Sequence, residues 1–115
     1  MSSSFTVASH FAKSSAPVRA TYDALLAASR SLGPVREEPK KTSIHFVRSS
    51  AFAGVATRKD SLILTLKSEI PLQHHRIRRA ERTSANRWHL ELRLANPDDV
   101  DAQVRSWLAA AYALG

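Results

Sequence analysis

One segment near the C-terminus alternates strictly between apolar and polar side chains. Its apolar positions are Trp88, Leu90, Leu92 and Leu94, and its polar positions are Arg87, His89, Glu91 and Arg93. Because successive side chains of a β-strand point to opposite faces of a sheet, this period of two predicts a strand with one buried and one exposed face. A fold that contains such a strand must also supply elements that cover its apolar face.

Two amphipathic helices are predicted to provide that cover. Residues 17–32 carry a mostly apolar stripe at helical spacing, preceded by the cap residue Ser15 and ended by Gly33-Pro34. The second helix is predicted to begin with Asn96 as its cap and Pro97 in its first position. Its apolar stripe consists of Val100, Val104, Trp107, Leu108 and Ala111. This order predicts an α+β fold with both helices packed on one sheet face.

The segment between the helices is predicted to form an antiparallel meander of four to five strands. These strands are expected at residues 43–48, 52–58 and 62–69, with a less regular strand at 77–83 before the alternating segment. Residues 34–42 are interpreted as a charged loop, and residues 6–11 as one short helical turn. The face of the sheet turned away from the helices is expected to carry Lys67, Arg87, His89, Glu91, Arg93 and His45.

Length and composition limit the kind of protein further. The 115 residues suit one domain, with residues 1–15 as a short lead-in. The absence of cysteine excludes disulfides and thiolate chemistry.

The N-terminal residues lack the pattern of a signal peptide, and no apolar run is long enough to span a membrane. We therefore expect a cytoplasmic protein without a membrane partner. A net charge of +7 favours an anionic partner, with nucleic acid as the first candidate.

Two groups of cations are candidates for contact with such a partner. The basic hairpin at residues 76–93 contains six arginines, and its predicted binding residues are Arg78, Arg79, Arg87, His89 and Arg93. The cationic rim, defined as Lys40, Lys41, Arg58 and Lys59, is the second group. Guanidinium groups bind phosphates through two parallel hydrogen bonds. The alternative for the hairpin is a solvated surface whose arginines form cross-strand ion pairs with Glu81 and Glu91.

Several segments of the chain resemble an uncharacterised family of bacterial domains. They comprise Gly33-Pro34-Val35-Arg36-Glu37-Glu38-Pro39-Lys40-Lys41-Thr42, the strand Ile44 to Phe46, Phe52-Ala53-Gly54-Val55, Arg58-Lys59, Asp99-Val100-Asp101, Trp107-Leu108 and Ala111-Tyr112. That family occurs alone, after another uncharacterised domain, and at the C-terminus of predicted transport proteins and restriction-enzyme-like proteins. It is placed near the frataxin-like and YdhG-like folds, so the resemblance implies an α-β-α order and no particular reaction. Frataxins deliver iron through an acidic first helix, whereas residues 17–32 contain a single acid, so iron delivery is not expected.

No pattern in the chain indicates catalysis. The five histidines lack metal-ligand spacing, and neither a Gly-rich phosphate loop nor a nucleophilic serine motif is present. Glu38-Pro39-Lys40 matches the Glu-x-Lys element of metal-dependent nucleases, but no acid on a preceding strand accompanies it. We therefore expect a binding module rather than an enzyme, with no cofactor and no metal.

Two other functions are consistent with the same residues. The open sheet face would pair with a second copy of the chain or with another domain, in which case charged side chains at Ile63 and Thr65 would disrupt the pairing. A small anionic ligand would instead occupy a pocket between the sheet and residues 34–42, lined by Lys41, Arg58 and His89.

Overall fold

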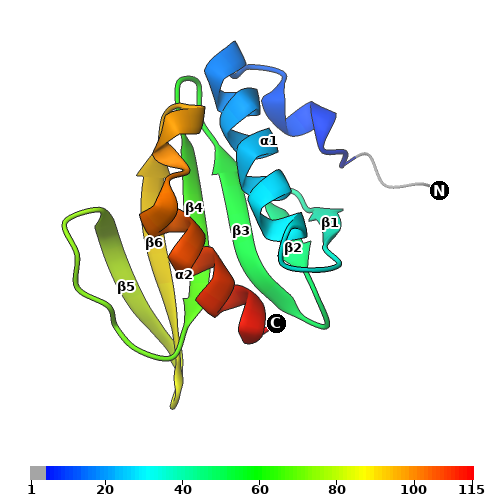
Figure 1. Cartoon of the computed structure of the whole chain (residues 1–115). Helices are drawn as coiled ribbons and strands as arrows, with labels where there is room; N and C mark the ends of the chain where they lie inside the picture. Colours follow the sequence, from blue (N-terminus) through cyan, green and yellow to red (C-terminus); the bar gives the residue numbers. More distant parts are fainter. Residues whose placement is uncertain (1–4) are drawn as a thin grey trace.

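Two helices cover one face of a six-stranded antiparallel sheet (Figure 1). The computed structural model describes residues 5–115. The elements in chain order are a short 3-10 turn η1 (Ala8–Phe11), α1 (Ala16–Arg30), β1 (Arg36–Pro39), β2 (Ile44–Val47), β3 (Ala51–Thr57), β4 (Leu62–Ser68), β5 (Ile77–Ser84), β6 (Arg87–Leu94), a second turn η2 (Pro97–Asp99) and α2 (Ala102–Ala113). The predicted α+β class and the position of both helices are confirmed. Within the described residues, no helix combines the length and the apolar character needed to cross a membrane.

The apolar sides of β4 and β6 form the centre of the core. Leu64 pairs with Leu92 in the register, and both side chains are fully buried. The helices meet this face with the stripes that the sequence predicted, in which Val18 and Leu25 of α1 and Leu108 of α2 are also fully buried. The strict alternation of residues 87–94 therefore reflects a strand with one buried side, as predicted, and β6 has the predicted bounds.

The strand order β1-β2-β3-β4-β6-β5 departs from a simple meander at one place. β6 pairs with β4, so β5 lies at the sheet edge and residues 69–76 connect β4 to it (Figure 1). The physical reason is that, of β5 and β6, only β6 has an alternating row of buried apolar side chains that matches the one on β4. β5 is exposed along most of its length, and a polar strand is tolerated best at an edge, where one side faces water.

The prediction that residues 34–42 form a loop is wrong, because they contain β1. This strand pairs antiparallel with β2, with Arg36 opposite Val47 and Pro39 opposite Ile44. Its side chains are mostly charged and it lies at the second sheet edge, where Pro39 is tolerated. Tyr22 of α1 donates a hydrogen bond to the Glu37 carboxylate. Burial, reinforced by Glu37, raises the pKa of the Tyr22 hydroxyl well above its ordinary value, so this donor stays protonated.

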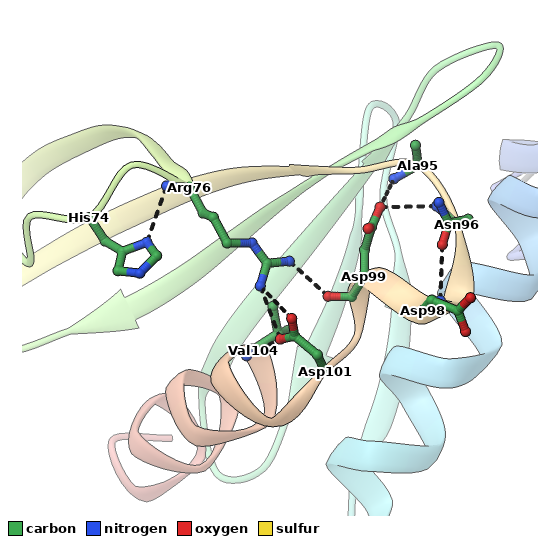
Figure 2. A network of polar contacts seen from close by, with 8 residues as sticks. All are labelled: His74, Arg76, Ala95, Asn96, Asp98, Asp99, Asp101 and Val104. Carbon is green, nitrogen blue, oxygen red and sulfur yellow. Dashed lines mark hydrogen bonds and ion pairs between the residues drawn. The ribbon is translucent and has the colours of Figure 1, made fainter.

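The segment predicted as the start of the second helix forms two separate elements, the 3-10 turn η2 and the helix α2, and each has its own N-cap residue (Figure 2). Asn96 caps the short turn η2, where its side chain accepts a hydrogen bond from the Asp98 backbone N–H at 3.1 Å. The backbone leaves helical geometry at Val100, and α2 begins only after Asp101, whose carboxylate accepts from the Val104 N–H at 3.1 Å. That backbone hydrogen bond, together with Arg76, holds the pKa of Asp101 below its usual range.

Arg76 joins the segment before β5 to the start of α2. Its guanidinium donates to both carboxylate oxygens of Asp101, at 3.0 and 2.9 Å, and to the Asp99 carbonyl oxygen at 2.8 Å (Figure 2). The backbone N–H of Arg76 donates to Nδ1 of His74 at 3.2 Å. One of the six arginines of the basic hairpin therefore has a structural role and is not available to a partner.

Replacing Arg76 by methionine is expected to lower the thermal midpoint Tm by several degrees, because it removes the ion pair with Asp101 and the hydrogen bond to the Asp99 carbonyl oxygen. Arg78→Met is the matched control, since the Arg78 side chain is exposed and forms no ion pair within residues 5–115. Differential scanning fluorimetry of both variants measures the effect. Equal Tm values for the two variants would contradict this role of Arg76.

Candidate functional site

The four residues of the cationic rim lie at the same end of the sheet. Lys40 and Lys41 belong to the turn between β1 and β2, and Arg58 and Lys59 to the turn between β3 and β4. The antiparallel pairing of β2 with β3 places the first residue of β2 near the last residues of β3. All four side chains are exposed. The fold thus brings together two pairs of cations that are at least 17 positions apart in the sequence.

The lead-in segment before α1 binds the backbone of both turns. Nε2 of His10 lies 2.8 Å from the Lys40 carbonyl oxygen, and the Thr57 hydroxyl donates to the His10 carbonyl oxygen at 2.5 Å. The Ser14 hydroxyl donates to the Arg58 carbonyl oxygen at 2.7 Å. The backbone N–H of Ser15 donates to the Lys59 carbonyl oxygen, also at 2.7 Å. Lys13 comes beside the rim as a result, and with His10, Ser14, Arg58 and Lys59 it lines a shallow hollow.

Few carboxylates neutralise these cations. Arg93 of β6 reaches the same end of the sheet, where its Nε donates to the Ser61 hydroxyl at 3.2 Å. Lys40 is the one rim residue with an ion pair within residues 5–115, to Glu38 at 3.3 Å. Hydrogen bonds from Arg36 and then from Lys40 hold the pKa of Glu38 below its usual range. The other rim cations, Lys13 and Arg93 lack ion pairs among the described residues, which leaves a concentration of positive charge at this end.

The arginines of the basic hairpin are arranged differently. Arg79 forms an ion pair with Glu81 at 2.8 Å, within one strand and not across strands as the alternative interpretation expected. Arg87 donates to the Asn86 carbonyl oxygen at 2.9 Å. Arg78 occupies the irregularity in the pairing of β5 with β6 and is exposed. Glu91 forms no ion pair with any residue that the structure describes. The hairpin therefore presents both signs of charge to solvent.

A second hollow, of about 220 Å³, lies on the open face of the sheet. Its lining includes His45, Gly54, Thr65, Lys67 and His89, which come from four neighbouring strands. Burial, and then the positive charge of Lys40, holds the pKa of His45 below its ordinary value. The sequence predicted a pocket lined by Lys41, Arg58 and His89. Of these three residues, only His89 lines this hollow. Lys41 and Arg58 belong to the turns at the end of the sheet and do not line it.

Some contributors to these surfaces were not predicted. Lys13 and His10 approach the rim through tertiary hydrogen bonds of the lead-in segment, which has no periodic pattern. Ser43, which directly precedes β2, also lines the hollow. In the part of the chain that the structure describes, three or more histidine or acidic side chains nowhere gather closely enough to hold a metal ion.

Comparison with known proteins gives one finding about the family. A family model described as Domain of unknown function (DUF5655) matches residues 7–115. No curated protein and no solved structure matches the chain. The family match covers α1, all six strands and α2, so it includes both the cationic rim and the open-face hollow. It confirms the uncharacterised family that the sequence resembled and carries no chemistry of its own.

Proposed function

The chain belongs to the DUF5655 family, and we propose that it is a small, basic, non-enzymatic module that binds an anionic partner through the cationic rim and the adjoining open sheet face. Nucleic acid is the first candidate for this partner, contacted through its phosphates. We place the protein in the cytoplasm and its fold near the frataxin-like group, as the sequence led us to expect.

The observation that carries this proposal is the uncompensated charge at the rim. Lys13, the doublet at 40–41 and the doublet at 58–59 come from three segments that are distant in sequence, and they lie at the same end of the sheet. Hydrogen bonds from the lead-in segment hold the backbone of both turns in place. Lys41, Arg58 and Lys59 have no ion pair among the described residues, so a phosphate would not have to displace a carboxylate. Contacts from lysine and arginine to phosphates carry no sequence information, so we expect affinity with little sequence preference.

The rim suits this role better than the basic hairpin does. On the hairpin, Arg79 is paired with Glu81, and Arg76 is held by Asp101. Glu91 adds a further acid to the open face. A polyanion laid along the hairpin would meet both signs of charge, whereas at the rim Asp60 is the only acid within either turn.

Fluorescence anisotropy with a labelled 20-base-pair duplex tests the proposal. The wild-type chain should bind with an affinity that falls steeply as salt rises. The triple variant K41Q/R58Q/K59Q should weaken binding by about tenfold or more and reduce the slope of log K against log salt by roughly 3, one for each lost phosphate contact. The triple variant R78Q/R79Q/R87Q removes the same charge from the hairpin and serves as the matched control.

Three outcomes would count against this function. Absence of salt-dependent binding by the wild-type chain would reject nucleic acid as the partner. A larger loss in the hairpin triple variant than in the rim triple variant would move the contact to residues 76–93. A stable dimer in light scattering, lost when Ile63 and Thr65 both become glutamate and unaccompanied by nucleic acid binding, would favour the interaction-domain alternative.

A further inference from the structure

The open-face hollow exists because the middle of the sheet lacks large side chains on that side. Gly54 of β3 lies between His45 of β2 and Thr65 of β4 in the register. A methyl group at Gly54 would lie 3.6 Å from Cδ2 of His45, which shows that the imidazole ring leans over the glycine. Ala51 and Ala56 flank Gly54 along the strand, so the floor of the hollow is apolar and low.

Hydrogen-bond donors surround this apolar floor. His45, Lys67 and His89 come from three different strands, and Thr65 and Ser43 add hydroxyl groups. Lys67 is opposite His89 in the register. Its ammonium donates to the Ser50 hydroxyl at 3.1 Å and lies 3.5 Å from the Leu114 carbonyl oxygen, contacts that hold the side chain in place.

The charges around His45 favour an anion at this position. Lys40 and His89 both oppose protonation of His45, and the acid that favours it, Glu38, is held by Arg36 and Lys40. Glu91 stands opposite Thr65 in the register but is not part of the lining, and no other acid lines the hollow. The lining therefore combines three groups that can carry positive charge with no carboxylate.

We propose that this hollow binds a small oxyanion, a carboxylate or phosphate group carried on a compact apolar body. The oxyanion would accept hydrogen bonds from Lys67, His45 and His89, and the body would rest on the floor at Gly54. A volume of about 220 Å³ is enough for a small molecule. The hollow lies on the open sheet face, but none of the four cationic-rim residues lines it, so binding of a small anion here is tested separately from the proposed nucleic acid contact.

The test is a titration of the full chain with inorganic phosphate and, separately, with benzoate, followed by NMR at the histidine ring Cε1–H signals. Saturable shifts are expected at His45 and His89, whereas His75, which is outside the lining, should not move. A bound anion should raise the pKa of His45, because it adds the opposite charge that the free site lacks. Saturation by either probe supports the site, and the better probe identifies the preferred oxyanion.

Three variants separate the site from surface charge in general. Lys67→Met should weaken binding by about tenfold, the effect of losing one charge-assisted hydrogen bond. Gly54→Ala should weaken benzoate more than phosphate, since the added methyl occupies the floor at an ordinary contact distance from His45 and leaves the fold intact. The third variant, K41Q/R58Q/K59Q, should bind benzoate like the wild type, so failure of the rim proposal would leave this one standing.

Several results would overturn the proposal. They are the absence of saturable shifts with both probes, equal shifts at all five histidines, or unchanged affinity in Lys67→Met. Circular dichroism of each variant establishes that it is folded, and His75→Gln controls for the loss of an imidazole elsewhere. If Lys67→Met does not fold, His89→Gln replaces it, because His89 is exposed and lies on the solvent side of β6.

Discussion

Replacing Leu92 by alanine is expected to lower the free energy of unfolding by roughly 2–5 kcal/mol, the range for truncating a buried leucine. Leu92 is fully buried at the centre of β6, opposite Leu64 on one side and Ile77 on the other. Its removal leaves a cavity between the sheet and the helices that the surrounding side chains fill incompletely. Urea denaturation measures the change as a lower midpoint with an unchanged m-value.

His89→Ala is the matched control for Leu92→Ala. Both residues belong to β6, but His89 is on the opposite side of the strand and is exposed. Its truncation should change the free energy of unfolding by no more than about 0.5 kcal/mol. Similar losses in the two variants would contradict a sheet with one buried and one open face.

Gly33→Ala is expected to be nearly as damaging, with a loss of roughly 2–4 kcal/mol. Gly33 follows α1 with φ at +152°, a backbone conformation that residues with a Cβ atom rarely adopt. An alanine Cβ would also lie 2.3 Å from the hydroxyl oxygen of Tyr112, far inside contact distance. Thermal or urea denaturation should show a folded but clearly less stable protein.

A double-mutant cycle with Tyr112→Phe distinguishes the two causes. The Tyr112 hydroxyl donates to the Pro34 carbonyl oxygen at 3.1 Å, so its removal has a modest cost of its own. If the steric clash matters, Gly33→Ala will cost less in the Tyr112→Phe background than in the wild type. An identical cost in both backgrounds would assign the whole effect to backbone conformation, and no cost in either would contradict the packing of α2 against Gly33.

The parts of the fold that the sequence predicted are those governed by local pattern. The bounds of β6 follow from its alternation, and α1 begins and ends within two residues of the prediction because Ser15 and Gly33 mark its ends. β1 was missed because its four side chains are charged or proline and its pairing with β2 decides its conformation. The position of β5 outside β6 was missed for a similar reason, since it depends on which strand best matches the apolar side of β4.

The two surfaces differ in how far sequence could identify them. Lys40-Lys41 and Arg58-Lys59 were recognised as one group because two cationic doublets stand beside predicted strands, the first in the loop before residues 43–48 and the second at the end of residues 52–58. The open-face hollow forms where the residues of neighbouring strands have small side chains or none. The apolar periodicity that identifies strands and helices does not indicate such a place. The available signal was Gly54 within a strand, because an isolated glycine there often marks a site where another group approaches the backbone closely.

The two edge strands, β1 and β5, have a consequence for behaviour at high concentration. Unpaired strand edges are templates for polymerisation, and charged side chains or proline on an edge discourage it. Pro39 ends one edge, and arginines and Glu81 are spaced along the other. A second chain that paired with β5 would bring like charges close together. One that paired with β1 would lack a hydrogen bond at Pro39, which has no backbone N–H. The charged residues and the proline that obscured β1 in the sequence, together with the arginines of β5, are thus expected to discourage aggregation through the edges of the sheet.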